Sequence, residues 1–243
     1  MSFVELLPGI IWSGFLGLTI GNFATNPIYR LPRNESLFRK DPYCGDCNAK
    51  LMPRDLFPVF SWLMTRGKCR YCGAKVPGAY AVTEAVIGLL FIICYLQFGF
   101  SEQFLLVSLG ITSFVMLGMM LLLDNFFSNK TLIACVILGM VYRTLQDGSI
   151  YGFIGTAYMG LLAGLVAWKI SGKPLIRDAA AFPVYLKLLT VAGIWLAPVR
   201  LCVLLTAVLI ILPYSKGKPW LTEWTIIVSI IILIIYSQVT LIL

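Results

Sequence analysis

The feature that most constrains this chain is a series of long apolar segments separated by short polar gaps. Each segment approaches the roughly 20 residues that an α-helix needs to cross the hydrocarbon core of a bilayer. The segments run over residues 6–26, 80–98, 103–123, 131–147, 150–169, 182–197, 199–214 and 223–243. The sixth and seventh are short and meet at Pro198 to Arg200, so seven spans are the alternative to eight. The sequence predicts an all-α integral membrane protein with about eight transmembrane helices.

The composition agrees with a chain that lies mostly in lipid. Of its 243 residues, 59% are hydrophobic and 12% are charged, whereas a soluble domain carries about 25% charged residues. The first apolar segment follows Glu5 rather than a basic region and has no small-residue cleavage pattern. We therefore interpret it as a membrane span and not as a cleaved signal peptide.

The net charge of +8 is distributed as membrane topology requires, which argues against nucleic-acid binding. Ten of the 19 Lys and Arg residues lie between Arg30 and Lys75. With eight spans and this loop in the cytoplasm, the cytoplasmic side carries sixteen of them and the opposite side only Arg143 and Arg200. Because basic residues concentrate on the cytoplasmic side, we expect both termini outside the cytoplasm. The absence of histidine excludes a Ser-His triad and a His-based metal site.

The only sizeable polar segment separates the first two spans and predicts a division into three parts. These are a first transmembrane helix at residues 1–28, a cytoplasmic loop at 29–79 and a membrane-embedded helical domain at 80–243. A loop of about fifty residues that contains five prolines buries too little apolar surface for a core of its own. It needs a covalent or metal cross-link.

Two Cys-x-x-Cys pairs in this loop supply such a cross-link: Cys44, Cys47, Cys69 and Cys72. They are 21 residues apart, which lets four thiolates close a tetrahedron around zinc. We expect Gly45 and Gly73 to let the backbone turn back toward the sulfurs. Two disulfides and a redox role are the other interpretations, but cytoplasmic thiols stay reduced. Four protein ligands would make the zinc structural, with no position open for water.

Several separated motifs between residues 14 and 90 resemble the type IV prepilin leader peptidases. They are GNFATNPIYRLP at residues 21–32, DLFPVFSW at 55–62, RGKCRYCG at 66–73, and Tyr80 with Glu84. The resemblance implies a GxGD-type aspartic endopeptidase of the bacterial inner membrane, which removes the leader of type IV prepilins and type II secretion pseudopilins at the cytoplasmic face. It also implies N-methylation of the new N-terminus with S-adenosylmethionine, an activity associated with the zinc loop.

The same resemblance makes Glu84 and the cysteine pairs candidate contacts for S-adenosylmethionine. The alternative for Glu84 is a carboxylate near a helix start, where the helix dipole favours negative charge.

The peptidase motifs of that family are altered in this chain. An aspartic protease needs two carboxylates that share a proton. Asp124 and Asp178 are the only two acidic residues suitably placed at cytoplasmic ends of spans, although Asp124 lies closer to Asn129 than the family spacing. The family's G-x-G-D-x-K-L-L reads FPVYLKLL at residues 182–189, so Tyr185 stands in the place of the second aspartate.

Three interpretations of this change remain. Asp178 has taken over as the second carboxylate, or the peptidase activity is lost while the loop keeps methyltransferase or pilin-handling work. Alternatively, Asp178 merely pairs with Arg177 or Lys173 in a solvated loop.

The sequence thus predicts a prepilin peptidase-like membrane protein that acts on prepilins or pseudopilins. Its predicted cofactors are zinc and, where methylation is retained, S-adenosylmethionine. The alternative is a non-catalytic scaffold of pilus or secretion assembly, which docks assembly proteins through its zinc loop.

Overall fold

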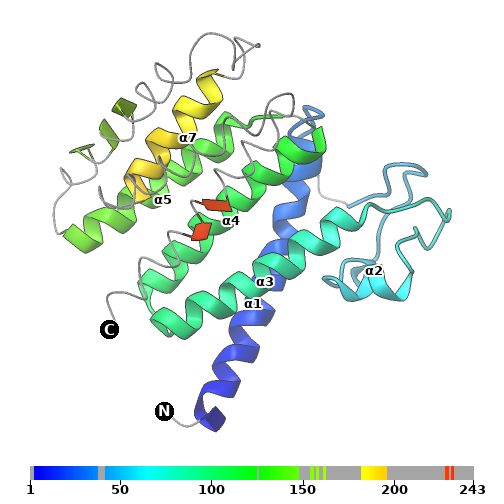
Figure 1. Ribbon diagram of the computed structural model, residues 1–243. Helices are drawn as coiled ribbons and strands as arrows, with labels where there is room; N and C mark the ends of the chain where they lie inside the picture. The colour runs from blue at the N-terminus through cyan, green and yellow to red at the C-terminus, as the bar shows by residue number, and fades with distance from the viewer. Residues whose placement is uncertain are drawn as a thin grey trace. The chain divides into compact units, whose positions relative to one another are not determined.

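Among the residues that the structure describes, the regular elements are helices, and the loop between the first two long helices consists mainly of turns. A computed structural model describes residues 3–37, 42–124, 126–147, 154–155, 157–158, 161–162, 182–195, 228–229 and 231–232. Figure 1 shows its helices, α1 (Phe3–Arg30), α2 (Phe60–Met64), α3 (Gly78–Phe98), α4 (Glu102–Asp124), α5 (Asn129–Asp147) and α7 (Phe182–Trp195), with a 3₁₀ turn at Pro53–Asp55. The chain divides into two compact units, Met1–Phe104 and Leu105–Leu243.

Three of the described helices are long and apolar enough to cross a membrane. They are Leu6–Arg30, Gly78–Phe98 and Glu102–Asp124, and they confirm the first three predicted spans. Helices α5 and α7 occupy the places of the fourth and sixth predicted spans without reaching the same length and apolarity. The fifth, seventh and eighth lie mostly or wholly outside the described residues, so the count of eight spans stays a prediction.

In the first unit, α1 and α3 pack along each other through glycines. A Cβ added to Gly17 would lie 2.9 Å from the Cα of Gly88, and one added to Gly21 would lie 2.9 Å from the Cα of Glu84. These neighbours are backbone atoms and cannot swing aside. Small residues four apart let membrane helices approach closely, and here they set the distance between α1 and α3.

We expect Gly17→Ala to loosen this helix pair. Its new methyl group would overlap α3, and overpacking of this kind costs about 1–3 kcal/mol. Thermal unfolding of the protein in detergent should therefore show a lower midpoint. Gly155→Ala is the matched control because a Cβ there would meet no atom of the described residues within 4 Å. Equal midpoints for the two variants would contradict glycine-mediated packing.

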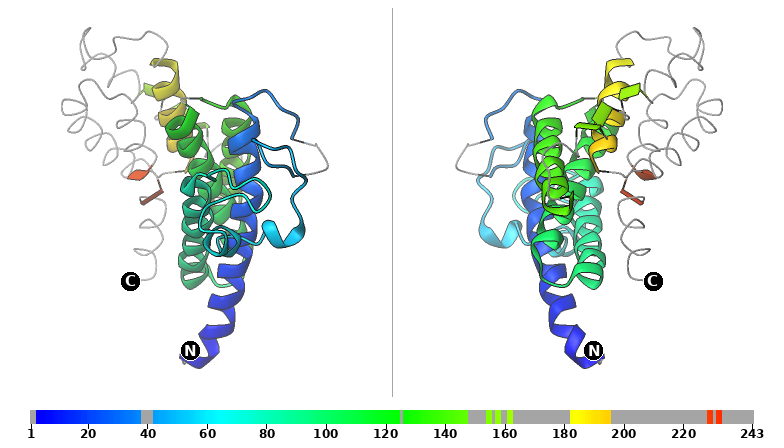
Figure 2. Two further views of the ribbon diagram at one scale, coloured as in Figure 1. Left: turned by 90° about the vertical axis from the view of Figure 1, so that its right-hand side faces the viewer. Right: turned by 90° about the vertical axis from the view of Figure 1, so that its left-hand side faces the viewer.

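The segment between α1 and α3 lies beside this helix pair. In Figures 1 and 2, α2 is found alongside α1 and α3, well back from the level at which α1 ends. The polypeptide therefore doubles back after α1 instead of extending away from it. This arrangement brings the cysteine-rich loop against the last turns of α1 and the first turns of α3.

In the second unit, α5 and α7 pack around Trp195. The indole N–H of Trp195 donates to the carbonyl of Cys135 at 3.1 Å, and its ring stacks on Tyr142 with 5.4 Å between centroids. At the other end of α7, the Nζ of Lys187 donates to the Oδ1 of Asn129 at 2.8 Å. Lys187, one of the residues that retain the family pattern in this part of the sequence, thus contacts Asn129 in space.

Candidate metal centre and the cavity beside it

The four cysteines predicted to bind metal come together. Their Sγ atoms all lie within 4.8 Å of one another, and those of Cys44 and Cys72 are 4.0 Å apart. Zinc–sulfur bonds of 2.3 Å give a tetrahedron with edges of about 3.8 Å, so the cluster needs little contraction. None of the four is in a disulfide. The cluster can hold a metal ion.

Both cysteine pairs sit on the same kind of backbone turn. In each, the N–H of the first cysteine donates to the carbonyl five residues later, and its own carbonyl accepts from the N–H four residues later, at 2.7–3.0 Å. An antiparallel bridge closes each turn, Tyr43 with Lys50 and Lys68 with Lys75. The sequences CGDCNAK and CRYCGAK match over this repeat. Local hydrogen bonds therefore form both halves of the centre.

The residue that reverses each turn is the one after the second cysteine. Asn48 (φ 55°) and Gly73 (φ 75°) have left-handed backbone, which glycine adopts freely and asparagine more readily than most residues. The expectation for Gly73 is confirmed, and that for Gly45 is wrong because its φ is not left-handed. A Cβ at Gly45 would lie 2.7 Å from the hydroxyl oxygen of Tyr29, which is the far end of a side chain and can shift.

The electrostatics of the cluster favour a bound cation. Burial raises the pKa of Cys69, but the N–H groups of Cys72 and Tyr71 and the neighbouring thiols outweigh it and lower that pKa to about 7. At Cys72 the N–H of Ala74 lowers the pKa, whereas desolvation and the other three thiols raise it to about 12. Cys69 therefore loses its proton readily, whereas the neighbouring thiols oppose the ionisation of Cys72. A divalent cation relieves that repulsion and displaces the remaining protons.

Asp55 supports the second cysteine pair from the side. Both residues between Cys69 and Cys72 bind its carboxylate, Tyr71 through a hydroxyl donated at 2.9 Å and Arg70 through an ion pair at 2.9 Å. The N–H of Met52 donates to the same carboxylate at 3.1 Å. The turn that carries two of the four sulfurs is thereby held in place. Sequence reasoning assigned Asp55 only to a motif and missed this role.

The ionised form of Asp55 is the stable one in the folded protein. Burial raises the pKa of Asp55, but the hydrogen bonds from Tyr71 and Met52 and the charges of Arg70 and Arg54 outweigh it and hold that pKa below 3.8. Because folding lowers the pKa of Asp55, the ionised carboxylate stabilises the folded protein at any pH above the ordinary pKa of an aspartate. This stabilisation is lost only as the pH falls through the lower pKa of the folded state.

We expect Asp55→Asn to weaken metal binding by about 10- to 100-fold, as loss of a group that orients metal ligands commonly does. The amide keeps the size of the side chain but loses the ion pair with Arg70. Affinity is measured by competition with a chelator. Asp46→Asn is the matched control, because Asp46 is an exposed residue within the first cysteine pair. If both variants bind metal equally, Asp55 has no such role.

Glu84 and Asn22 fasten the start of α2 to the helix pair. Glu84 accepts a hydrogen bond from the N–H of Val59 at 2.7 Å and another from the amide of Asn22 at 3.0 Å. The Asn22 amide also donates to the carbonyl of Leu56 at 3.1 Å. Val59 has φ 59°, a rare backbone for a β-branched residue, and this contact holds it there. We call these four residues the clamp.

The clamp gives Glu84 a structural role that the sequence did not reveal. Glu84 is buried and lies beyond the first turn of α3, where the helix dipole acts most strongly. It also lines the cavity described next. Its predicted contact with a cofactor stays a prediction.

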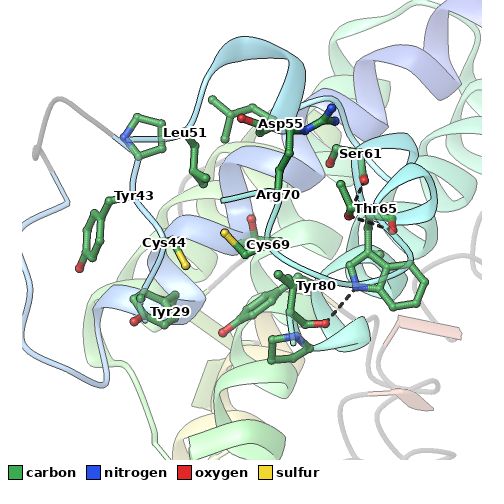
Figure 3. Close-up of a pocket in the computed structure, with 18 of the residues that line it drawn as sticks. Tyr29, Tyr43, Cys44, Leu51, Asp55, Ser61, Thr65, Cys69, Arg70 and Tyr80 are labelled. Carbon is green, nitrogen blue, oxygen red and sulfur yellow. Dashed lines mark hydrogen bonds and ion pairs between the residues drawn. The ribbon is translucent and has the colours of Figure 1, made fainter. Parts of the chain in front are cut away.

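A cavity of about 520 Å³ lies between the cysteine-rich loop, the end of α1 and the start of α3 (Figure 3). In that view the sulfurs of Cys44 and Cys69 face one another at its wall. Its lining also includes aromatic side chains, acids and cations, among them Tyr29, Tyr43, Trp62, Tyr80, Asp55, Glu84, Arg30, Arg33 and Lys68. The volume falls within the range of small-molecule sites. The lining suits a ligand that has both a flat ring and charged groups.

The predicted peptidase residues are only partly described. Asp124 is the last residue of α4 and is exposed. Tyr185 belongs to α7, two residues before Lys187. Asp178 lies outside the described residues, so the pairing of Asp124 with Asp178 stays a prediction.

The region that holds the cysteine cluster is similar to known proteins. Residues 15–98 match the family model of the bacterial peptidase A24 N-terminal domain. The chain is 35% identical over 88 residues to a prepilin leader peptidase/N-methyltransferase of Myxococcus xanthus, and 32% identical over 87 residues to one of Bacillus subtilis. Over this segment the chain is similar to prepilin leader peptidase/N-methyltransferases. The similarity supports the family that the motifs indicated.

Similarity to the prepilin leader peptidases is concentrated in the first unit. The two matches above each cover 36% of this chain, and they span only 26% and 35% of the length of the relatives. A weaker match to the enzyme of Aeromonas hydrophila, 28% identical over 232 residues, covers 79% of this chain and 77% of that protein. No solved structure matches the chain.

Proposed function

We propose that this protein processes type IV prepilins or type II secretion pseudopilins at the cytoplasmic face of the bacterial inner membrane. One observation carries the proposal. The segment shared with the family, residues 15–98, contains both cysteine pairs, Asp55, the clamp and the cavity that they border. The cysteine cluster and the cavity beside it therefore lie in the part of the chain that is similar to its relatives.

The metal that we propose for the cluster is zinc. Four cysteine sulfurs within 4.8 Å of one another suit a structural zinc site, in which protein ligands would take all four coordination positions. The ion would cross-link two turns that otherwise depend on a few hydrogen bonds. Its contribution is to fold the loop and so to form one wall of the cavity.

We propose the cavity as the site for S-adenosylmethionine. When bound, this cofactor supplies the methyl group for the new N-terminus. The residues that line the cavity fit its chemistry, since aromatic side chains suit a purine, Arg30 and Arg33 suit a carboxylate, and Glu84 suits a positively charged group. These side chains would bind and orient the cofactor next to the end of α1 and the start of α3.

Of the two activities that the family name combines, we propose that methylation is retained and leader cleavage is lost. Cleavage needs a second carboxylate beside Asp124 to activate water, and Tyr185 stands at the position where the family has an aspartate. The phenol of tyrosine, whose ordinary pKa is about 10, cannot replace a carboxylate as the base of the dyad.

The test separates the two steps. Purified full-length protein is incubated with S-adenosylmethionine and either intact prepilin or pilin whose leader was removed beforehand. Mass spectrometry then reads the N-terminus of the product. We expect methylation of the pre-cleaved pilin and no removal of the leader from prepilin. Leader removal that is abolished both by Asp124→Asn and by Asp178→Asn would show instead that Asp178 completes the dyad. If the protein contains its metal and yields neither methylated pilin nor leader-free pilin, the scaffold alternative is favoured.

A further inference from the structure

The short helix α2 presents an apolar face to its surroundings. Phe60, Leu63 and Met64 are spaced three and four residues apart and therefore share one side of the helix. They are 52%, 56% and 79% exposed. Phe57 extends the same surface, with its ring 5.9 Å from that of Phe60 and 54% exposed. We call these four side chains the α2 apolar face.

The opposite side of α2 is already committed to the protein. Ser61, Trp62 and Thr65 line the cavity. The indole N–H of Trp62 donates to the carbonyl of Val76 at 3.1 Å, and its ring lies so close to Gly67 that a Cβ there would meet it at 2.9 Å. The helix therefore cannot rotate to bury its apolar face without breaking these contacts.

The clamp fixes the level of α2 relative to the membrane-spanning helices. Glu84 lies six residues into α3, and Asn22 lies eight residues before the end of α1, which correspond to about 9 Å and 12 Å along the helix axes. On one side of this level, residues 85–96 of α3 and 9–21 of α1 contain no charged residue. On the other side come Asn26, Arg30 and the cysteine-rich loop. The clamp thus marks the boundary between the lipid-facing and polar parts of the helix pair.

Basic residues flank the α2 apolar face on both sides. Arg54 precedes Phe57 by three residues, and Arg66 and Lys68 follow Met64 closely; all three are exposed. Apolar side chains next to Lys and Arg are typical of segments that lie in the interface of a bilayer, where cations meet anionic headgroups.

From these observations we propose that α2 is an interfacial membrane anchor. Its apolar face enters the headgroup–acyl boundary of the leaflet that α1 and α3 cross at the level of the clamp. The occupant is lipid because α2 lies beside α1 and α3 (Figures 1 and 2), which are long and apolar enough to cross a membrane. The clamp ties α2 to the level at which the uncharged stretches of these helices end. Anchoring would hold the wall of the cavity that α2 forms against the membrane surface.

The proposal is tested with full-length protein in nanodiscs of phosphatidylethanolamine and phosphatidylglycerol. A photoreactive benzophenone amino acid replaces Leu63 or Met64, and mass spectrometry measures lipid adducts after illumination. Asp46, exposed in the first cysteine pair, is the control position. We expect at least fivefold more lipid adducts at Leu63 and Met64 than at Asp46. Equal yields at all three positions would overturn the proposal.

Two further outcomes identify other occupants and would equally overturn it. Cross-links from Met64 to a second copy of the chain, in place of lipid, would make the face a dimer contact. Cross-links to prepilin in place of lipid, seen only when prepilin is added, would make it a substrate contact. Because adduct yield does not depend on enzymatic activity, the result stands apart from the proposed function. Metal content equal to wild type shows that each labelled protein has folded.

Discussion

Cys69→Ser is expected to deplete the purified protein of metal to below a tenth of one ion per chain. Cys69 is the buried member of the cluster, and its pKa is lowered to about 7 by neighbouring N–H groups and thiols, so its loss removes a ligand that is prepared to bind. Structural zinc sites contribute about 10–16 kcal/mol of apparent binding energy in small domains, and the loop has little apolar core to replace it. Residues 42–76 should therefore become sensitive to proteases. Metal is measured by elemental analysis and loop integrity by limited proteolysis.

The control for this experiment is Cys94→Ala, which removes a buried cysteine of α3 outside the cluster. It should keep the metal and the protected loop. The α1–α3 pair should survive in both variants, because its close contacts are made by glycines within the helices. Stoichiometric metal in Cys69→Ser, or disulfides between the four cysteines in freshly purified protein, would refute the metal centre.

The second large effect is expected from restoring the altered peptidase motif. The triple variant Phe182→Gly, Val184→Gly and Tyr185→Asp rebuilds the glycine–aspartate pattern that the family carries ahead of Lys187. It returns a carboxylate and removes two bulky side chains. General acid–base groups contribute on the order of 10²–10⁴-fold to a rate, so leader removal should rise by at least that factor over wild type in the prepilin assay.

Adding Asp124→Asn to the triple variant is the decisive control. If Asp124 is the first carboxylate of the dyad, this change should return leader removal to the wild-type level. Adding Asp178→Asn should have no effect, because the restored aspartate makes it unnecessary. Equal activity of the triple variant with and without Asp124 would exclude Asp124 from the reaction.

The cysteine cluster could be predicted from the sequence because its geometry is largely local. A Cys-x-x-Cys turn brings its own two sulfurs together, so only the meeting of two such turns depends on the fold. The first three spans followed equally directly from length and hydrophobicity. The error at Gly45 shows the limit of such reasoning. The presence of a glycine suggested that the backbone turns at position 45. The left-handed backbone lies instead at Asn48, because asparagine also tolerates this conformation.

The contacts that support the centre could not be predicted in this way. Asp55 reaches Tyr71 across sixteen positions in the sequence, and Asn22 reaches Glu84 across sixty-two. Each is a single hydrogen bond between residues with no shared periodicity or motif spacing. The one available signal for Asn22 and Glu84 is that a polar or charged side chain in an apolar helix is costly without a partner. That signal indicates that Asn22 and Glu84 each need a partner, but it does not predict that they bind each other.

We expect the clamp to make the cavity sensitive to the lipid around it. Its wall is shared between two helices embedded in the bilayer and a loop tied to both of them by Asn22 and Glu84. A bilayer that is thinner or thicker than the apolar length of α1 changes the tilt of that helix. Such a change would move Asn22 against Glu84 and strain the hydrogen bonds that hold the loop at the wall of the cavity. Acyl-chain length is therefore an experimental variable for ligand affinity at this site, to be controlled as carefully as pH or salt.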